Sequence, residues 1–403
     1  MNSTPNANRK HITIFGSTNA GKSSLLNAII GQEVSIVSNV KGTTTDPVTK
    51  PMELIPFGPV VFIDTAGLND TSELGSVRIK RTRKVLQSTD FAIYVMDASD
   101  SEDSCYPSAL EDYKKYKIPY MLVINKIDSI SDEKLAQLKI TFSNAVFVTA
   151  NEANDTHQRG DTILDLKDVL IKRLSEDEIE ETIIGDILPA GSKVILVIPV
   201  DSEAPKGRII LPQMQLLRDC LDHGIKSYVV RDSELVSALE DLKDIDMVVT
   251  DSQAFKFVNS VVPADIKLTG FSVLFARYKG DLKAFVDGVH HVKNLKDGSR
   301  ILIAESCTHN HSHEDIGRVK IPKLLSDFTQ KKLEFEFKMG QDFPEDLSEY
   351  DLVIHCGSCM LNKKIMQTRV DTCADAGVSI TNYGVILAYL NGILDRSVEM
   401  FGL

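Results

Sequence analysis

The run Gly16-Ser-Thr-Asn-Ala-Gly21-Lys22-Ser23 constrains the fold of this chain more than any other segment, because it fits the pattern G-x-x-x-x-G-K-S/T. The apolar run His11–Phe15 before it predicts a strand, and residues 22–30 after it predict a helix. A glycine-rich turn between a strand and a helix presents backbone N–H groups that bind phosphate oxygens. We therefore expect an α/β domain whose first loop binds phosphate.

Apolar runs and helical patterns alternate through the rest of residues 1–178, which we expect to form one P-loop domain. The expected strands are Val60–Ile63, Phe91–Met96, Tyr120–Ile124 and Ala145–Val148, and the expected helices are 73–87, 106–116 and 161–174. Almost continuously apolar strands separated by helices predict a mostly parallel sheet that is covered on both faces. The acidic stretch Ser175–Thr182 is expected to end this domain or to link it to the next.

The alternation continues in two further α/β units, as expected for a chain of 403 residues. Residues 183–264 are predicted to form a small unit, and residues 266–403 a third. The second unit is predicted from strands at Lys193–Val200, Ser227–Val230 and Met247–Thr250 and from helices at Pro212–His223 and 233–242. The third is predicted from strands at Arg300–Ala304 and Asp351–His355 and from helices at 280–291 and 384–394. The second unit lacks a glycine-rich loop, so we expect it to serve scaffolding or self-association.

Residues that would hold phosphate and Mg²⁺ follow the first predicted strands. Lys22 is expected to contact the β- and γ-phosphates, and Ser23 to ligate Mg²⁺. Asp64 ends the strand Val60–Ile63 and is expected to hold the Mg²⁺ shell, while the N–H of Gly67 would meet the γ-phosphate. The segment Lys41–Asp46, between the phosphate-binding loop and Asp64, contains three threonines. We expect Thr44 to complete the Mg²⁺ site. Thr43 and Thr45 are not excluded.

The sequence Asn125-Lys126-Ile127-Asp128 predicts that the bound base is guanine. A carboxylate at Asp128 can accept hydrogen bonds from N1–H and the 2-amino group of guanine, and adenine offers neither donor on that edge. Thr149 and Ala150 are expected to support the base through backbone contacts. The predicted GTP/GDP-binding set is Gly16, Asn19, Ala20, Gly21, Lys22, Ser23, Ser24, Asn125, Lys126, Asp128, Thr149 and Ala150.

These residues resemble the translation-factor-like GTPases of the tRNA-modification and ribosome-assembly type. The resemblance rests on Asn19, Leu25-Leu26-Asn27, Gly42–Asp46 and Asp64–Leu68. It implies that Asn19 helps to bind K⁺, which supplies positive charge where other GTPases use an arginine. Leu68 stands where other GTPases carry a water-positioning glutamine, so intrinsic hydrolysis should be slow. Thr45 departs from the arginine that is common in related GTPases, which puts the stabilisation of this loop in doubt.

Three of the six cysteines cluster with histidines near the C-terminus, a spacing that points to a metal centre. Cys307 and His309 follow the strand Arg300–Ala304, and His355, Cys356 and Cys359 lie at the end of the strand predicted at Asp351–His355. Thiolates bind zinc or iron–sulfur centres, and the residues leave both open. For a [4Fe-4S] cluster on three cysteines, His309, His355, Glu305 or an external molecule would be the fourth ligand. The remaining cysteines, Cys105, Cys220 and Cys373, are expected to be core or surface thiols.

A P-loop GTPase domain followed by this cysteine–histidine set resembles the GTPase maturation factors of [FeFe]-hydrogenase, the HydF family. The matching residues are Gly16–Ser24, Gly42–Asp46, Asp64–Leu68, Glu73–Gly75, Asn125–Asp128, Cys307, His309, His355, Cys356 and Cys359. The resemblance implies a scaffold that receives a diiron precursor with the help of two radical-SAM maturases and delivers it to the apo-hydrogenase. It also implies a homodimer formed by the middle domain, and a [4Fe-4S] cluster held by Cys307, Cys356 and Cys359. GTP binding and hydrolysis would then gate partner exchange.

Composition limits the alternatives. The formal net charge of −12 argues against a general nucleic-acid surface, which needs a concentrated basic face. There is no apolar run of the roughly 20 residues that span a bilayer and no secretory h-region, so we expect a cytoplasmic protein. One alternative is a zinc-containing GTPase that acts in tRNA modification or ribosome assembly. Another is a scaffold that binds GTP without turnover, against which the complete Mg²⁺ and switch motifs argue.

The Asn19 resemblance predicts a K⁺ effect. GTP hydrolysis by the full chain should be faster in a K⁺ buffer than in a Na⁺ buffer of the same ionic strength, because K⁺ bound near Asn19 would neutralise charge that develops on the phosphates. Phosphate release measured in parallel in the two buffers checks this. Equal rates of GTP hydrolysis in the two buffers would contradict a K⁺ site at Asn19.

Overall fold

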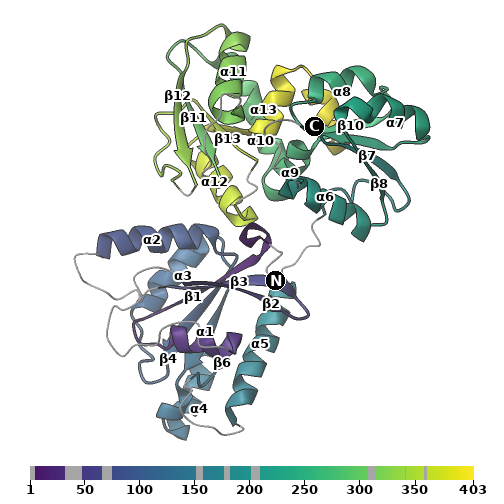
Figure 1. Cartoon of the computed structure of the whole chain (residues 1–403). Coiled ribbons are helices and arrows are strands. Elements are labelled where there is room, and N and C mark those ends of the chain that lie inside the picture. The colour runs from purple at the N-terminus through teal and green to yellow at the C-terminus, as the bar shows by residue number, and fades with distance from the viewer. Residues whose placement is uncertain are drawn as a thin grey trace. The chain divides into compact units, whose positions relative to one another are not determined.

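The computed structural model describes residues 5–31, 48–65, 75–150, 158–176, 182–200, 209–306, 315–340, 342–357 and 361–403. For residues 75–81 and 158–161 it describes the backbone alone. The chain divides into two compact units, Met1–Ile179 and Glu180–Leu403 (Figure 1). Each unit is built on parallel β-sheet, which confirms the predicted α/β class.

The first unit contains a six-stranded sheet in the order β2-β3-β1-β4-β5-β6. Its strands are β1 Lys10–Gly16, β2 Val48–Leu54, β3 Gly58–Asp64, β4 Phe91–Asp97, β5 Tyr120–Asn125 and β6 Val146–Phe147. Every pairing is parallel except that of β2 with β3, so the sheet is mostly parallel, as predicted. Strand β1 is central, which places the loop after Gly16 in the middle of one sheet edge.

Helices cover both faces of this sheet (Figure 1). They are α1 Lys22–Ile30, α2 Gly75–Ser88, α3 Cys105–Lys115, α4 Asp132–Thr141 and α5 Gln158–Glu176. Burial on both faces explains why the sequence of strand β4 is apolar. Ile93 and Val95 lie in a core that includes residues of α1 and α5. Tyr94 and Met96 lie in a second core, with residues of α3. Alternate side chains of a strand point to opposite faces, so a strand covered on both needs apolar residues at every position.

The second unit contains two four-stranded sheets, β10-β9-β7-β8 and β12-β11-β13-β14, in which all recorded pairings are parallel. The strands are β7 Lys193–Val197, β8 Lys226–Val230, β9 Met247–Thr250, β10 Lys267–Gly270, β11 Arg300–Glu305, β12 Glu334–Met339, β13 Leu352–His355 and β14 Ser379–Asn382. Strand β10 pairs with β9, so the first of these sheets extends past the boundary that we predicted at residues 264–266.

The helices of the second unit pack the two sheets into one body. They are α6 Leu211–Asp222, α7 Leu235–Asp241, α8 Phe255–Val261, α9 Phe271–Lys279, α10 Leu282–Val289, α11 Ile321–Thr329, α12 Lys363–Asp375, α13 Tyr383–Leu390 and α14 Leu394–Val398, with a π-helical turn at Ile316–Lys320. Helix α9 joins the sheets, because Phe271 and Leu274 belong to the core of the first and Val273 to the core of the second.

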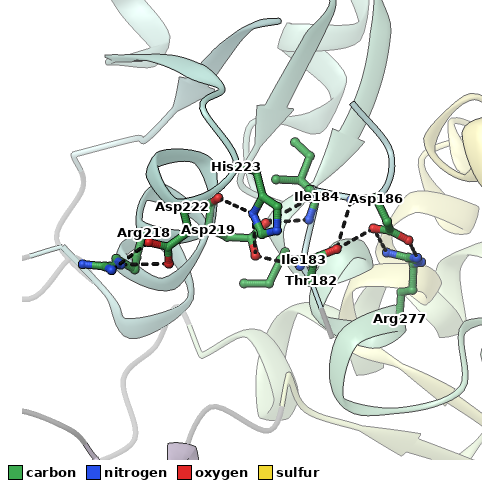
Figure 2. Close-up of polar contacts among 10 residues, drawn as sticks. Thr182, Ile183, Ile184, Asp186, Arg218, Asp219, Asp222, His223 and Arg277 are labelled. Carbon is green, nitrogen blue, oxygen red and sulfur yellow. Dashed lines mark hydrogen bonds and ion pairs between the residues drawn. The ribbon is translucent and has the colours of Figure 1, made fainter. Parts of the chain in front are cut away.

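The segment that enters the second unit is fixed by polar contacts (Figure 2). The carboxylate of Asp219, on α6, accepts hydrogen bonds from the N–H groups of Ile183, Ile184 and Gly185 at 3.1, 2.8 and 3.1 Å. Arg277 of α9 forms an ion pair with Asp186. A carboxylate that accepts three N–H groups orders a segment that has no regular secondary structure of its own.

Four strands were not predicted from the sequence, namely β2, β10, β12 and β14. Each lies at the edge of its sheet. Strands β2 and β12 are only partly buried, so their sequences alternate or carry polar residues, as in Glu334–Met339 (EFEFKM). Strands β10 and β14 are mostly buried, but each has only four residues, too few to form a clear pattern. Among the described residues, no helix combines the length and apolarity needed to cross a bilayer.

Close packing of α10 on β14 generates a stability prediction. A Cβ added at Gly288 would lie 1.9 Å from the carbonyl oxygen of Ile380. Alanine is the better helix former, so any loss of stability in Gly288→Ala must come from this collision. We expect a loss of roughly 1–3 kcal/mol, seen as a lower urea midpoint for the second unit by circular dichroism. The control is Asp287→Ala, at an exposed position on the same helix. Equal midpoints for the two variants would contradict the packing.

Candidate functional site

The loop after β1 has a backbone conformation that its glycines make possible. Gly16, Asn19 and Gly21 have φ angles of 141°, 66° and 92°. A Cβ at Gly16 would lie 2.2 Å from the carbonyl oxygen of Val95, and one at Gly21 would lie 2.2 Å from Nδ2 of Asn125. Gly21 directly precedes α1, so the loop ends at a helix N-terminus, where N–H groups attract an anion.

Lys22 is a buried cation inside this loop. Its side chain donates hydrogen bonds to the carbonyl oxygens of Gly16 and Ser17, both at 2.9 Å. Burial lowers the pKa of Lys22 to about 8, and the nearby carboxylates of Asp64 and Asp103 oppose this shift. The loop therefore holds an ammonium group at the helix N-terminus, an arrangement suited to phosphate oxygens.

Ser23 and Asp64 form a small oxygen cluster next to Lys22. Ser23 Oγ donates to Asp64 Oδ2 at 2.6 Å, and Asp64 is only 1% exposed. Its other oxygen, Oδ1, is buried and has no hydrogen-bond partner among the described residues. Burial raises the pKa of Asp64, while the Ser23 hydrogen bond and the charge of Lys22 lower it. A buried carboxylate oxygen beside a hydroxyl fits a hard cation such as Mg²⁺, which prefers oxygen ligands.

Asn125 links the phosphate-binding loop to the loops predicted to hold the base. Its Nδ2 donates to the carbonyl of Ala20 at 3.0 Å, and its Oδ1 accepts from the N–H of Ala150 at 3.0 Å. The side chain is 1% exposed. Lys126 adds a second link, because its Nζ donates to the carbonyl of Asn19 and to Asp97 Oδ2, each at 2.6 Å.

Of the remaining predicted nucleotide ligands, some lie within the described residues and others lie outside them. Asp128 lies in a short 3-10 turn, Ile127–Ser129, with an exposed side chain, and Thr149 is buried at the end of β6. Ser24 lies in the first turn of α1. Thr44 and Gly67, together with Thr43, Thr45 and Leu68, lie outside the described residues. The roles given to all of them stay predictions.

Sequence reasoning missed two acidic residues that contact residues of this site, namely Asp97 beside Lys126 and Asp103 beside Ser17 of the phosphate-binding loop. Asp97 ends β4 and pairs with Lys126, and Asp103 accepts a hydrogen bond from Ser17 Oγ at 2.6 Å. Asp97 could have been found, because β4 is parallel to β1 and ends at the same sheet edge. Asp103 lies beyond the end of a strand, and no sequence pattern singles it out.

Cys356 lies next to the strand that leads to Cys307. Strands β11 and β13 are parallel neighbours, and the N–H of Cys356 donates to the carbonyl of Ala304 at 2.9 Å. The N–H of Ser306 donates to Cys356 Sγ at 3.0 Å, and the Ser306 hydroxyl contacts the same sulfur. Cys307, His309 and Cys359 lie outside the described residues, so their convergence on Cys356 stays a prediction.

Two of the candidate fourth ligands have their donor atoms engaged. The fully buried His355 donates through Nδ1 to the carbonyl of Cys356 at 2.8 Å and accepts through Nε2 from Arg369 at 2.6 Å. Burial lowers the pKa of His355 to about 3, so the ring is neutral. Glu305, 3% exposed, accepts from Arg318 Nε at 3.1 Å and from Nη2 at 2.8 Å. His355 would have to leave its partners in order to bind a metal, whereas the carboxylate of Glu305 keeps further acceptor sites beside Arg318.

Two other cysteines in the described part of the chain, Cys220 and Cys373, are poor ligands. Cys220 and Cys373 are completely buried, and burial raises the pKa of each thiol to about 12. Within the residues that the structure describes, no group of three or more His, Cys, Asp or Glu is arranged to hold a metal.

Comparison with protein families divides the chain into three regions. A model described as the hydrogen maturase F dimerization domain matches residues 183–280, and one described as the hydrogen maturase F tetramerization domain matches residues 283–400. A model described as the 50S ribosome-binding GTPase matches residues 11–126. The two maturase models together cover more than half of the sequence.

Curated relatives match the N-terminal region. GTPase Era of Heliobacterium modesticaldum is 33% identical over 167 residues, which are 41% of this chain and 55% of that protein. The tRNA modification GTPase MnmE of Ralstonia nicotianae is 36% identical over 126 residues, 29% of this chain and 26% of that protein. GTPase Der of Wolinella succinogenes is 40% identical over 131 residues, 30% of this chain and 26% of that protein. The chain thus spans about half, or less, of the length of these relatives.

The position of Asn125 generates a binding prediction. Asn125→Ala leaves the buried carbonyl of Ala20 and the N–H of Ala150 without their partner, so the loops lose their mutual support. We expect GDP to bind at least tenfold more weakly, a loss of about 1.4 kcal/mol, as measured by calorimetry with Mg²⁺ present. Asn144→Ala, at an exposed position of the same unit, is the control. If both variants bind GDP equally well, Asn125 does not organise the site.

Proposed function

The chain belongs to the hydrogen maturase F family, and on that premise we propose that it is a GTP-binding and GTP-hydrolysing scaffold that assembles and delivers the diiron precursor of the [FeFe]-hydrogenase active site. The observation that carries the proposal is the presence in one chain of two sets of residues. One is the Lys22, Ser23 and Asp64 group after parallel strands of the first unit, and the other is Cys356 after a parallel strand of the second.

In the nucleotide site, each described residue has a distinct task. Lys22 would neutralise charge on the β- and γ-phosphates, and the Asp128 carboxylate would select guanine. Ser23 and the buried Oδ1 of Asp64 would hold Mg²⁺, which when bound neutralises phosphate charge. Asn125 keeps the phosphate and base loops at a fixed spacing. With Thr44 and Gly67 completing the set, these groups orient GTP for attack by water.

Turnover is proposed to be slow and stimulated by K⁺ bound at Asn19. Asn19 is exposed in the loop and has a positive φ of 66°, and its carbonyl accepts from Lys126. Slow hydrolysis suits a timing step, in which GTP and GDP states favour different partners. The partners proposed on the family premise are the apo-hydrogenase and the radical-SAM maturases.

Cys307, Cys356 and Cys359 are proposed to hold a [4Fe-4S] cluster. Two features of the described residues fit an anionic thiolate centre at Cys356. The first is the pair of Ser306 groups that face its sulfur. The second is Arg369, which is 4% exposed: burial lowers its pKa to about 10, and the nearby Cys356 opposes this shift. When bound, such a cluster supplies one iron with an exchangeable position, while the diiron precursor is the cargo.

Self-association is proposed to involve both regions of the second unit. The middle region was expected to dimerise, and the description of its family model agrees with that expectation. The family model for residues 283–400 names tetramerization, which we did not predict for the region that contains Cys356. Assembly and cluster binding would then share one region. A cytoplasmic location is part of the same proposal.

The alternative, a zinc-containing GTPase of tRNA modification or ribosome assembly, has weaker support. The Era and MnmE relatives cover 41% and 29% of this chain, whereas the maturase models cover the region that holds Cys356. Metal analysis separates the two functions, because zinc gives a colourless protein and an iron–sulfur cluster gives visible absorption and, when reduced, an EPR signal.

The cluster proposal is tested with Cys356→Ala. Protein reconstituted with iron and sulfide without oxygen should bind about four irons per chain in the wild type, the content of one such cluster. The variant should lose most of that iron, because one of three thiolate ligands is gone. The matched control is Cys220→Ala, which removes a buried thiol of α6 from the core of the other sheet and should keep the iron.

The result also decides between the functions. Wild-type protein that takes up zinc and no iron would overturn the maturation proposal. Iron-loaded wild-type protein should then activate an apo-hydrogenase when it carries the diiron precursor, and failure of that transfer would remove the carrier role.

A further inference from the structure

Asp103 is a buried carboxylate that contacts the phosphate-binding loop but belongs to none of its motifs. It lies between β4 and α3 and is 8% exposed. Its Oδ1 accepts from Ser17 Oγ at 2.6 Å and from the N–H of Cys105 at 3.0 Å, and its Oδ2 accepts from the hydroxyl of Tyr94 at 2.9 Å. The carboxylate is thus surrounded by donors.

Ser17 is held from two sides as a result. Its hydroxyl donates to Asp103, and its carbonyl accepts from the ammonium group of Lys22 at 2.9 Å. The charge of Asp103 also acts favourably on Lys22. Asp103, Ser17 and Lys22 therefore form one chain of contacts that runs from a loop outside the nucleotide motifs to the cation expected to meet phosphate.

Capping of α3 explains only part of this arrangement. An aspartate that accepts the N–H two residues later makes a common local bond at a helix start, and the bond to Cys105 is of that kind. The bond to Ser17 joins residues 86 positions apart, and the bond to Tyr94 is buried within the unit. A negative charge close to a phosphate site weakens anion binding, so the position of Asp103 needs another explanation. Support of the phosphate-binding loop is such an explanation.

We propose that Asp103 is a positioning residue for nucleotide binding, which acts through the Ser17 hydroxyl to hold the phosphate-binding loop in the shape that presents Lys22 and the loop N–H groups to phosphate. The inference rests on the proposed function only in that the loop must bind GTP and GDP. It does not depend on the cysteine site or on hydrogenase maturation.

The test is a double-mutant cycle on the full chain, with GDP and GTP dissociation constants measured in the presence of Mg²⁺. Asp103→Asn removes the carboxylate charge that strengthens the bond from the Ser17 hydroxyl, so this bond becomes an ordinary neutral one. We expect about tenfold weaker binding of both nucleotides, and a similar loss in Ser17→Ala. The double variant should bind no more weakly than Ser17→Ala alone, because Asp103 has no effect on the loop once the Ser17 hydroxyl is gone. Ser17→Thr keeps the hydroxyl and should keep most of the affinity.

Two further measurements distinguish a positioning role of Asp103 from a general loss of protein stability. The KM for GTP should rise in Asp103→Asn while kcat at saturating GTP stays nearly unchanged. The matched control is Asp90→Asn: Asp90 Oδ2 accepts from the N–H of His11 at 2.8 Å, at the start of β1 and far from the loop that follows its end. This control should leave both dissociation constants unchanged.

Each outcome has one meaning. Wild-type protein that does not bind GDP would refute the proposed nucleotide site itself. If wild-type protein binds GDP, the inference is overturned by unchanged affinity in Asp103→Asn, or by losses that add in the double variant. Should Asp103→Asn fail to fold, Ser17→Ala decides alone, because Ser17 is only partly buried and its variant keeps the α3 cap.

Discussion

Asn125 donates to the carbonyl of Ala20 and accepts from the N–H of Ala150, so one buried side chain fixes the phosphate-binding loop against the loops expected to hold a base. The rest of the first site depends on this spacing, since Lys22, Ser23 and Asp64 can act on a nucleotide only if its base and phosphates are held together. The geometry follows from parallel pairing, which brings the ends of β1, β3, β4 and β5 to one edge of the sheet.

The same construction recurs in the second unit with different chemistry. Strands β11 and β13 are parallel neighbours, so the residues after them meet, and Ser306 comes to donate to Cys356. In the first unit the strand ends carry oxygen ligands, a cation and glycines. In the second they carry a thiol with hydrogen-bond donors around it. One architectural rule therefore places the residues proposed to hold phosphate and Mg²⁺ in one unit, and the thiol proposed to hold a metal cluster in the other.

Buried charge marks both sites. Lys22 lies close to Asp64 and to Asp103, and Arg369 lies close to His355 and Cys356. The four charged residues, Lys22, Asp64, Asp103 and Arg369, are all buried. Desolvation of an ion costs free energy that surface positions avoid, so such groups contribute little to stability and are better explained by the anions or cations they are placed to meet. His355 is neutral and links Arg369 to the backbone at Cys356, which orients the guanidinium. These four buried charges thus lie where ligands are expected, whereas others, such as Arg9 against β2 and β3, do not.

The sequence by itself determined the α/β class, the central strands and the residues at their ends, because buried strands are continuously apolar and the binding patterns are local. It did not reveal the edge strands β2, β10, β12 and β14. Strands β2 and β12 are partly exposed and carry polar residues, while β10 and β14 are buried segments of only four residues, too short for a clear pattern. Tertiary structure alone decided that Asp103 reaches Ser17, that Arg369 meets His355, and that Glu305 is paired with Arg318. Such contacts join side chains from separate elements, and no periodicity records them, because they arise only when the elements pack.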